Sequence, residues 1–128
     1  MNSPRLRRLS EARLYGIVDL GYVEATSCEL VTQALLDGGV DILQLRAKGL
    51  EAPQIARLAE RLVPSCHQRG VPFIVNDFVE VACGVGADGV HLGQEDGSIA
   101  EAFARLPEGA VVGRSTHSPL QARAALAE

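Results

Sequence analysis

Short runs of apolar residues alternate along this chain with longer segments in which apolar residues recur at helical spacing. The runs are rich in Val, Ile and Leu, which is typical of parallel strands that are covered on both faces. They predict five strands, at residues 14–19, 40–46, 71–77, 89–94 and 110–116. Because strands and helices alternate, the pattern predicts an α/β fold built on a parallel sheet.

The segments between the runs carry signals for helix ends. Thr26 followed by Glu29 has the spacing of a capping box, so we expect the first helix to begin there. Pro53 suits the first turn of the second helix, whereas Pro64 predicts that the same helix is kinked or split. The remaining three helices are expected to begin at residues that can cap them, Asp77, Ser98 and Ser118.

Polar residues follow the ends of four of the five predicted strands. In a barrel these ends meet on one face, whereas in an open doubly wound sheet they spread along an edge. We therefore predict a member of the (β/α)8 TIM-barrel family, with this chain covering about the first five β/α units. A complete barrel needs about 200 residues or more, so we expect 1–128 to be a single, truncated barrel domain with an N-terminal extension at 1–13.

Composition excludes several classes of partner. The net charge of −4 offers no basic surface for nucleic acid. The apolar runs fall far below the roughly 20 residues of a membrane span. Three widely spaced cysteines do not form a disulfide framework, which favours the reducing cytoplasm. The open edges of a partial sheet would need cover, which allows a homo-oligomer or another partner chain.

A group of polar side chains ends the second predicted strand. Gln44, Arg46 and Lys48 alternate, so their side chains leave the same face. Arg46 offers a planar fork for phosphate oxygens and Lys48 a compact positive charge. Ordinary charges at an exposed strand end would look similar, but an amide facing a barrel interior needs a partner. Gln44 therefore favours a binding site.

Two carboxylates, Asp77 and Asp96, are expected at neighbouring strand ends. Such a pair is costly unless a cation lies between them, and oxygen ligands beside a phosphate ester favour Mg²⁺. Capping and turn roles are the alternatives. Gly93 would let a flat ligand approach the backbone, and the Ser115 hydroxyl would donate to phosphate. His91 is interpreted as an inner histidine with a partner, and no side chain is assigned as a catalytic nucleophile.

Four ordered segments complete the picture: QLRAK after GGVDIL, VND after VPFI, GADGVHLGQED, and GRSTHS. In this order and spacing they resemble the thiamine-phosphate synthase family over residues 14–128.

The resemblance implies a (β/α)8 transferase that uses Mg²⁺. Such an enzyme joins 4-amino-2-methyl-5-pyrimidinylmethyl diphosphate to thiazole phosphate and releases pyrophosphate. It implies that Asp77 and Asp96 bind Mg²⁺. The implied pyrimidine site consists of Gln44, the Gly93 backbone and Tyr15; the implied diphosphate site consists of Arg46, Lys48, Asn76 and Ser115. The later strands of the family lie beyond residue 128, so we expect this chain alone to bind the pyrimidine diphosphate weakly and not to catalyse.

Two alternatives stay open. A thiazole tautomerase of the same fold would use a histidine at the position of His117 as acid and base, but it has no evident need for Asp77 and Asp96. A non-catalytic module that binds phosphate or a partner chain is the second alternative, because the predicted sheet is open.

Overall fold

The computed structural model describes residues 9–128. All five predicted strands are confirmed, each somewhat shorter than its apolar run. They pair in parallel in the order β1-β2-β3-β4-β5, so every strand lies beside its neighbour in sequence. The bounds of the strands are β1 Tyr15–Asp19, β2 Ile42–Arg46, β3 Phe73–Asn76, β4 Gly89–Leu92 and β5 Val111–Arg114.

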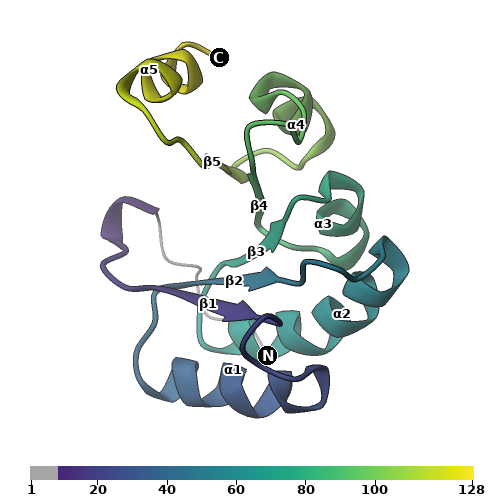
Figure 1. Ribbon diagram of the computed structural model, residues 1–128. Helices are drawn as coiled ribbons and strands as arrows, with labels where there is room; N and C mark the ends of the chain where they lie inside the picture. The colour runs from purple at the N-terminus through teal and green to yellow at the C-terminus, as the bar shows by residue number, and fades with distance from the viewer. Residues whose placement is uncertain (1–8) are drawn as a thin grey trace.

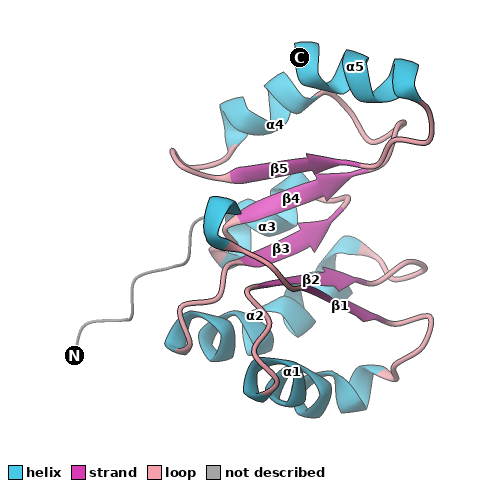
Figure 2. Cartoon of the chain, turned by 90° about the vertical axis from the view of Figure 1, so that its left-hand side faces the viewer, coloured by secondary structure: helices cyan, strands magenta, loops and turns pink. Residues whose placement is uncertain are grey.

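Helices connect each strand to the next, and α1 to α4 form one continuous layer in which each helix packs on its neighbour (Figures 1 and 2). A doubly wound sheet has helices on both faces and reverses its strand order at a switch point. Sequential order with a layer of helices on one side is instead the wall of a barrel, as predicted. The bounds are η1 Leu9–Glu11, η2 Ala25–Ser27, α1 Cys28–Asp37, α2 Ala52–Gln68, α3 Val79–Val85, α4 Ile99–Arg105 and α5 Pro119–Ala127.

The two faces of the sheet differ because side chains alternate along a strand. The face toward the helices forms the hydrophobic core, in which strand residues pack against helix residues such as Ile55 and Leu62. Its strand members are Val18, Leu43, Leu45, Phe73, Val75, Val90 and Leu92. The opposite face carries polar groups, among them Gln44, Asn76 and His91. This inner face therefore presents the candidate site.

The predicted capping box at the first helix is wrong. Residues 25–27 form a 3-10 turn, so α1 begins at Cys28, and its N-cap Ser27 makes no side-chain cap bond. An N-cap residue needs an extended backbone, whereas Thr26 lies inside the turn. The chain does have a capping box, but at α2, where the Gln54 side chain accepts from the Glu51 backbone N–H at 3.0 Å.

The predicted split of the second helix and the predicted cap of the third are also wrong. Pro64 does not split α2, which runs without interruption from Ala52 to Gln68. Proline removes a bond to the carbonyl four residues earlier, and here both Pro64 and Glu60 are exposed, so water can reach that carbonyl. Asp77 does not cap α3, whose N-cap is Phe78.

The remaining two caps are confirmed, whereas the N-terminal extension stays a prediction. Ser98 and Ser118 cap α4 and α5 as predicted, since their hydroxyls accept from Glu101 N and Gln121 N at 2.9 and 3.1 Å. Of the extension, residues 1–8 lie outside the described part of the chain, and η1 follows them. Within residues 9–128, no helix has the length and apolar character needed to cross a bilayer.

Candidate active site

A cavity of about 320 Å³ opens on the inner face of the sheet. Each of the five strands, or the residue that follows it, contributes to its lining. The lining residues are Tyr15, Ile17, Gln44, Arg46, Asn76, His91 and Ser115. The sequence-based prediction that polar strand residues converge on one face is therefore confirmed for Gln44, Arg46, Asn76 and Ser115.

A row of polar side chains crosses the floor of this cavity. Gln44 is 3% exposed and donates from Nε2 to the Tyr15 hydroxyl at 3.0 Å. The Asn76 amide lies 3.0 Å from Gln44 Oε1 on one side and 3.0 and 3.1 Å from the Asp77 carboxylate on the other. One orientation of the amide donates to Gln44 and the other to Asp77. Burial raises the pKa of Tyr15 despite its bond with Gln44, so the phenol is protonated at neutral pH.

His91 and Ser115 form a second pair in the lining. His91 Nε2 lies 2.8 Å from the Ser115 hydroxyl. Burial lowers the pKa of His91 although the charge of Asp77 acts to raise it, so the ring is mainly neutral at pH 7. Gly113 lies opposite His91 in β5, and a Cβ there would come within 2.5 Å of His91 Nδ1. The interpretation of His91 as an inner histidine with a partner is confirmed.

The two predicted metal ligands lie beside this cavity, in a group that also contains Lys48 and Gly93. Lys48 Nζ forms an ion pair with Asp77 Oδ2. Asp96 Oδ2 accepts from the Gly93 backbone N–H at 2.7 Å. The carboxyl groups of Asp77 and Asp96 lie close enough for each to shift the pKa of the other.

The pKa values of these two acids move in opposite directions. Burial, reinforced by the charge of Asp96, raises the pKa of Asp77 even though Lys48 opposes it. Burial also acts to raise the pKa of Asp96, but the Gly93 N–H, the Asp77 contact and the charges of Lys48 and Arg114 outweigh it and lower the pKa. The raised pKa shows that Lys48 does not fully compensate the cost of charging Asp77, so a further cation would stabilise its carboxylate.

Asp77 also has an unusual backbone conformation. Its φ is +76°, and it is the non-glycine residue with positive φ among residues 9–128. Its N–H donates to the carbonyl of His91 at 2.8 Å, which fixes the end of β3 against β4. Strained conformations of this kind persist where the surrounding contacts hold them, and they concentrate at functional sites.

The region of this chain that matches known proteins begins just before β1 and extends to the end of α5. A family model described as thiamine monophosphate synthase matches residues 14–128. The chain belongs to the thiamine monophosphate synthase family. A thiamine-phosphate synthase from Deinococcus radiodurans is 53% identical over 114 residues, covering 84% of this chain and 40% of the relative. One from Thermus thermophilus is 48% identical over 97 residues, covering 76% of this chain and 46% of the relative.

A solved structure of the same family supports the fold. The thiamine phosphate pyrophosphorylase from Pyrococcus furiosus is 31% identical and superimposes with a TM-score of 0.78. The match covers 91% of this chain and 55% of that one. The chain thus spans about half the length of the relatives it matches.

The synthase family implies Mg²⁺, and the acidic pair fits that ion. Within residues 9–128 no cluster of three or more His, Cys, Asp or Glu side chains could enclose a metal. Mg²⁺ does not require one, since it is commonly held by one or two carboxylates, several waters and the phosphates of a substrate. Asp77 and Asp96 supply two adjoining carboxylates next to a cavity that would admit a phosphate ester.

Sequence reasoning missed one partner of the predicted synthase residues. Asp19, the last residue of β1, forms an ion pair with Arg46 in which Oδ2 lies 3.0 Å from Nη1. The other oxygen of Asp19 accepts from Gly21 N at 2.8 Å, which holds the carboxylate in its loop. Asp19 and Arg46 are direct partners in the register of β1 and β2. An acid at the end of the first strand was the available signal, but only the register reveals the pairing.

Proposed function

We propose that this chain binds the pyrimidine diphosphate substrate of a Mg²⁺-dependent thiamine-phosphate synthase, and that the whole protein is that transferase. One observation carries the proposal: a cavity lined mainly by polar residues from β1 to β4 and by Ser115 after β5 adjoins two neighbouring carboxylates, Asp77 and Asp96. A diphosphate ester needs both parts, because its ring must be oriented while its charge is neutralised. Residues 14–128 would be one partial barrel domain, preceded by an extension at 1–13.

The roles proposed for individual residues divide between the two parts. In the cavity, Gln44 and Tyr15 would orient the aminopyrimidine, with the backbone of Gly93 at its edge. This assignment is supported by the bond between Gln44 and Tyr15, which already fixes the direction of the amide. The diphosphate would be bound by Arg46, Lys48, Asn76 and Ser115.

The proposed reaction mainly requires stabilisation of its leaving group, the diphosphate. The bond between the pyrimidine methylene carbon and the diphosphate oxygen breaks, and its electron pair stays on the diphosphate. The thiazole nitrogen then donates its lone pair to that carbon and forms the new C–N bond. Asp77 and Asp96 would hold Mg²⁺, which when bound neutralises charge on the departing diphosphate. Arg46 and Lys48 add two further positive charges, so no enzyme nucleophile is needed.

Both cations of the site already have an acidic partner in the structure. Arg46 is paired with Asp19 and Lys48 with Asp77. Both side chains are substantially exposed, at 40% and 50%, so their ion pairs are weak and a diphosphate can share or displace them. These ion pairs keep two positive charges beside the cavity, and neither charge is buried without a partner.

The tautomerase alternative receives no comparable support. His117 is exposed and lies outside the cavity lining, and its backbone N–H donates to Gln121 Oε1 at 2.7 Å. We also propose a cytoplasmic location, which is supported by three free cysteines.

Calorimetric titration with 4-amino-2-methyl-5-pyrimidinylmethyl diphosphate, with and without Mg²⁺, tests the proposal. The parent chain is expected to bind only with Mg²⁺, and Asp77→Asn and Asp96→Asn are each expected to lose that binding. Arg61→Gln is a matched control, because Arg61 is exposed on α2 and its partner Glu29 lies on α1. Binding that ignores Mg²⁺, or that survives both Asn substitutions, would reject the proposed site.

A further inference from the structure

An arginine is buried behind the loop that carries Asp96. Arg114 is the last residue of β5, and its side chain is only 7% exposed. It is the register partner of Leu92 in β4, which belongs to the hydrophobic core, whereas the cavity-facing His91 is paired with Gly113. Arg114 therefore points to the helix side of the sheet, away from the cavity. A buried charge in that place is costly unless its hydrogen-bonding capacity is satisfied.

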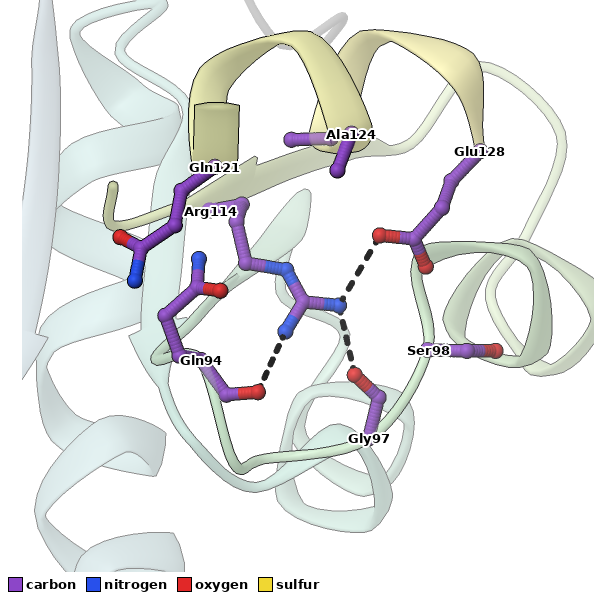
Figure 3. Close-up of a pocket in the computed structure, with 8 residues that line it drawn as sticks. Gln94, Gly97, Ser98, Arg114, Gln121, Ala124 and Glu128 are labelled. Atoms are coloured by element: carbon purple, nitrogen blue, oxygen red, sulfur yellow. Dashed lines mark hydrogen bonds and ion pairs between the residues drawn. The ribbon is translucent and has the colours of Figure 1, made fainter. Parts of the chain in front are cut away.

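The guanidinium of Arg114 is satisfied almost entirely by one loop. Nη1 donates to the carbonyls of Gly93 and Gln94 at 2.8 and 3.3 Å, and Nη2 donates to the carbonyl of Gly97 at 2.6 Å. Figure 3 shows the side chain between the loop and the end of α5, with Glu128 on its far side. The Glu128 carboxylate lies 3.6 Å from Nη2. The three carbonyls flank Asp96 in sequence, two before it and one after it.

The loop held in this way is the short turn from β4 to α4. Within it, Asp96 N–H donates to Gly93 O at 3.3 Å, while Asp96 Oδ2 accepts from Gly93 N at 2.7 Å. Gly97 has a φ of +100°, which glycine adopts freely. One further hydrogen bond links this loop to the segment after β5. In it, Gln94 Nε2 donates to Ser115 O at 2.7 Å.

We infer that Arg114 is a positioning residue: by binding three carbonyls of the 93–97 loop, it holds the Asp96 carboxylate beside Asp77, where the two together receive a divalent cation. The inference rests on the proposed function, since it assumes that Asp96 is a metal ligand. Partners that orient metal ligands typically contribute 10- to 100-fold to metal affinity.

A role for Arg114 as an anion-binding residue is disfavoured by its surroundings. A cavity of about 250 Å³ adjoins it, lined also by Gln121, Ala124 and Glu128. The guanidinium there faces three carbonyl oxygens and a carboxylate, so the local field is already negative and would repel a phosphate. Its Nη1 and Nη2 donors are engaged with the loop. The geometry instead indicates that Arg114 supports the backbone of the 93–97 loop.

The test is a titration with Mn²⁺ in the presence of inorganic pyrophosphate, followed by water-proton relaxation enhancement, which distinguishes protein-bound from free Mn²⁺ pyrophosphate. Arg114→Lys keeps the charge but loses the planar fork, and Arg114→Gln loses both. Each is expected to weaken binding by about tenfold or more, whereas Arg61→Gln on α2 leaves it unchanged. A folded Arg114→Gln protein that binds as tightly as the parent overturns the inference.

Hydrogen exchange in the parent chain gives an independent test that does not depend on a variant folding. The amides of Gly93 and Asp96 are expected to exchange more slowly than that of Gly109, another turn glycine with positive φ, at +85°. Equal exchange rates would overturn the inference, because the loop would then not be held. If the parent fails to bind Mn²⁺ pyrophosphate, the proposed function fails, and the exchange rates still decide whether the 93–97 loop is held, as the inference requires.

Discussion

Asp77 combines a strained backbone with a proposed metal ligand, and two substitutions can separate these features. Its φ of +76° lies in the left-handed region, which glycine adopts without steric cost. Alanine in the same conformation is disfavoured by about 1 kcal/mol. Asp77→Gly and Asp77→Ala both remove the carboxylate and the ion pair with Lys48. The difference between them therefore isolates the backbone, and Asp77→Gly is expected to be the more stable by about 1 kcal/mol.

Urea unfolding at pH 7 measures this difference, and a thermal scan should show a shift of roughly 4 °C between the two variants. Gly49→Ala calibrates the backbone contribution elsewhere in the chain. Gly49 has a φ of +91°, and a Cβ there would meet no atom within 4 Å. Its loss of stability, also about 1 kcal/mol, therefore reports the conformation alone.

The reasoning is refuted if Asp77→Gly and Asp77→Ala unfold at the same urea concentration while Gly49→Ala is clearly destabilised. Asp77 would then not be held at positive φ in the folded chain. Mn²⁺ binding supplies the second readout. Both Asp77 variants are expected to lose it, and a glycine variant that binds like the parent would exclude the carboxylate as a ligand.

Three further predictions concern other parts of the chain. Gly113→Ala should cost about 1–3 kcal/mol in urea unfolding, since its Cβ would lie 2.5 Å from His91 Nδ1, whereas Gly84→Ala in α3 should cost nothing. Burial and the charge of Asp88 raise the pKa of Cys66 from 9.0 to about 12. The folded state therefore binds this proton more tightly, and the unfolding free energy should fall between pH 9 and 12 more steeply in the parent than in Cys66→Ala. Asp19→Asn should lower stability by about 0.5 kcal/mol in dilute buffer and by nothing measurable in 1 M salt, because the pair with Arg46 is partly exposed.

The fold could be predicted because strand composition and sequence order carry most of the information. The predicted strands were too long for a reason that the structure makes clear. Val40 and Val71 belong to the apolar runs and are 3% and 1% exposed, yet they lie before β2 and β3 begin. Hydrophobicity reports burial, whereas strand bounds depend on backbone pairing, which single residues do not encode. For the same reason Thr26 and Glu29 had the right spacing but the wrong backbone for a capping box.

The candidate site could be predicted in its membership but not in its contacts. Gln44, Asn76 and Asp77 were identifiable because polar residues that end apolar strands must face something other than the core. The pairing of Arg46 with Asp19 depends on the register between strands. The role inferred for Arg114 depends on which face of β5 it occupies, and within the sequence it is one charged residue beside the Ser, Thr and His of the same segment.

The positive φ of Asp77 explains how neighbouring residues serve the same site. In a regular strand, successive side chains point to opposite faces, so with Asn76 in the cavity the next residue would point toward the helices. Asp77 instead lies against Lys48 and within 3.0 and 3.1 Å of the Asn76 amide. The turn at its backbone breaks the alternation and returns the carboxylate to the inner side. The positive φ of Asp77 thus places its carboxylate next to the cavity. Glycine at this position would keep the same backbone turn but lack the carboxylate. We therefore expect Asp77→Gly to be more stable than Asp77→Ala without recovering metal binding.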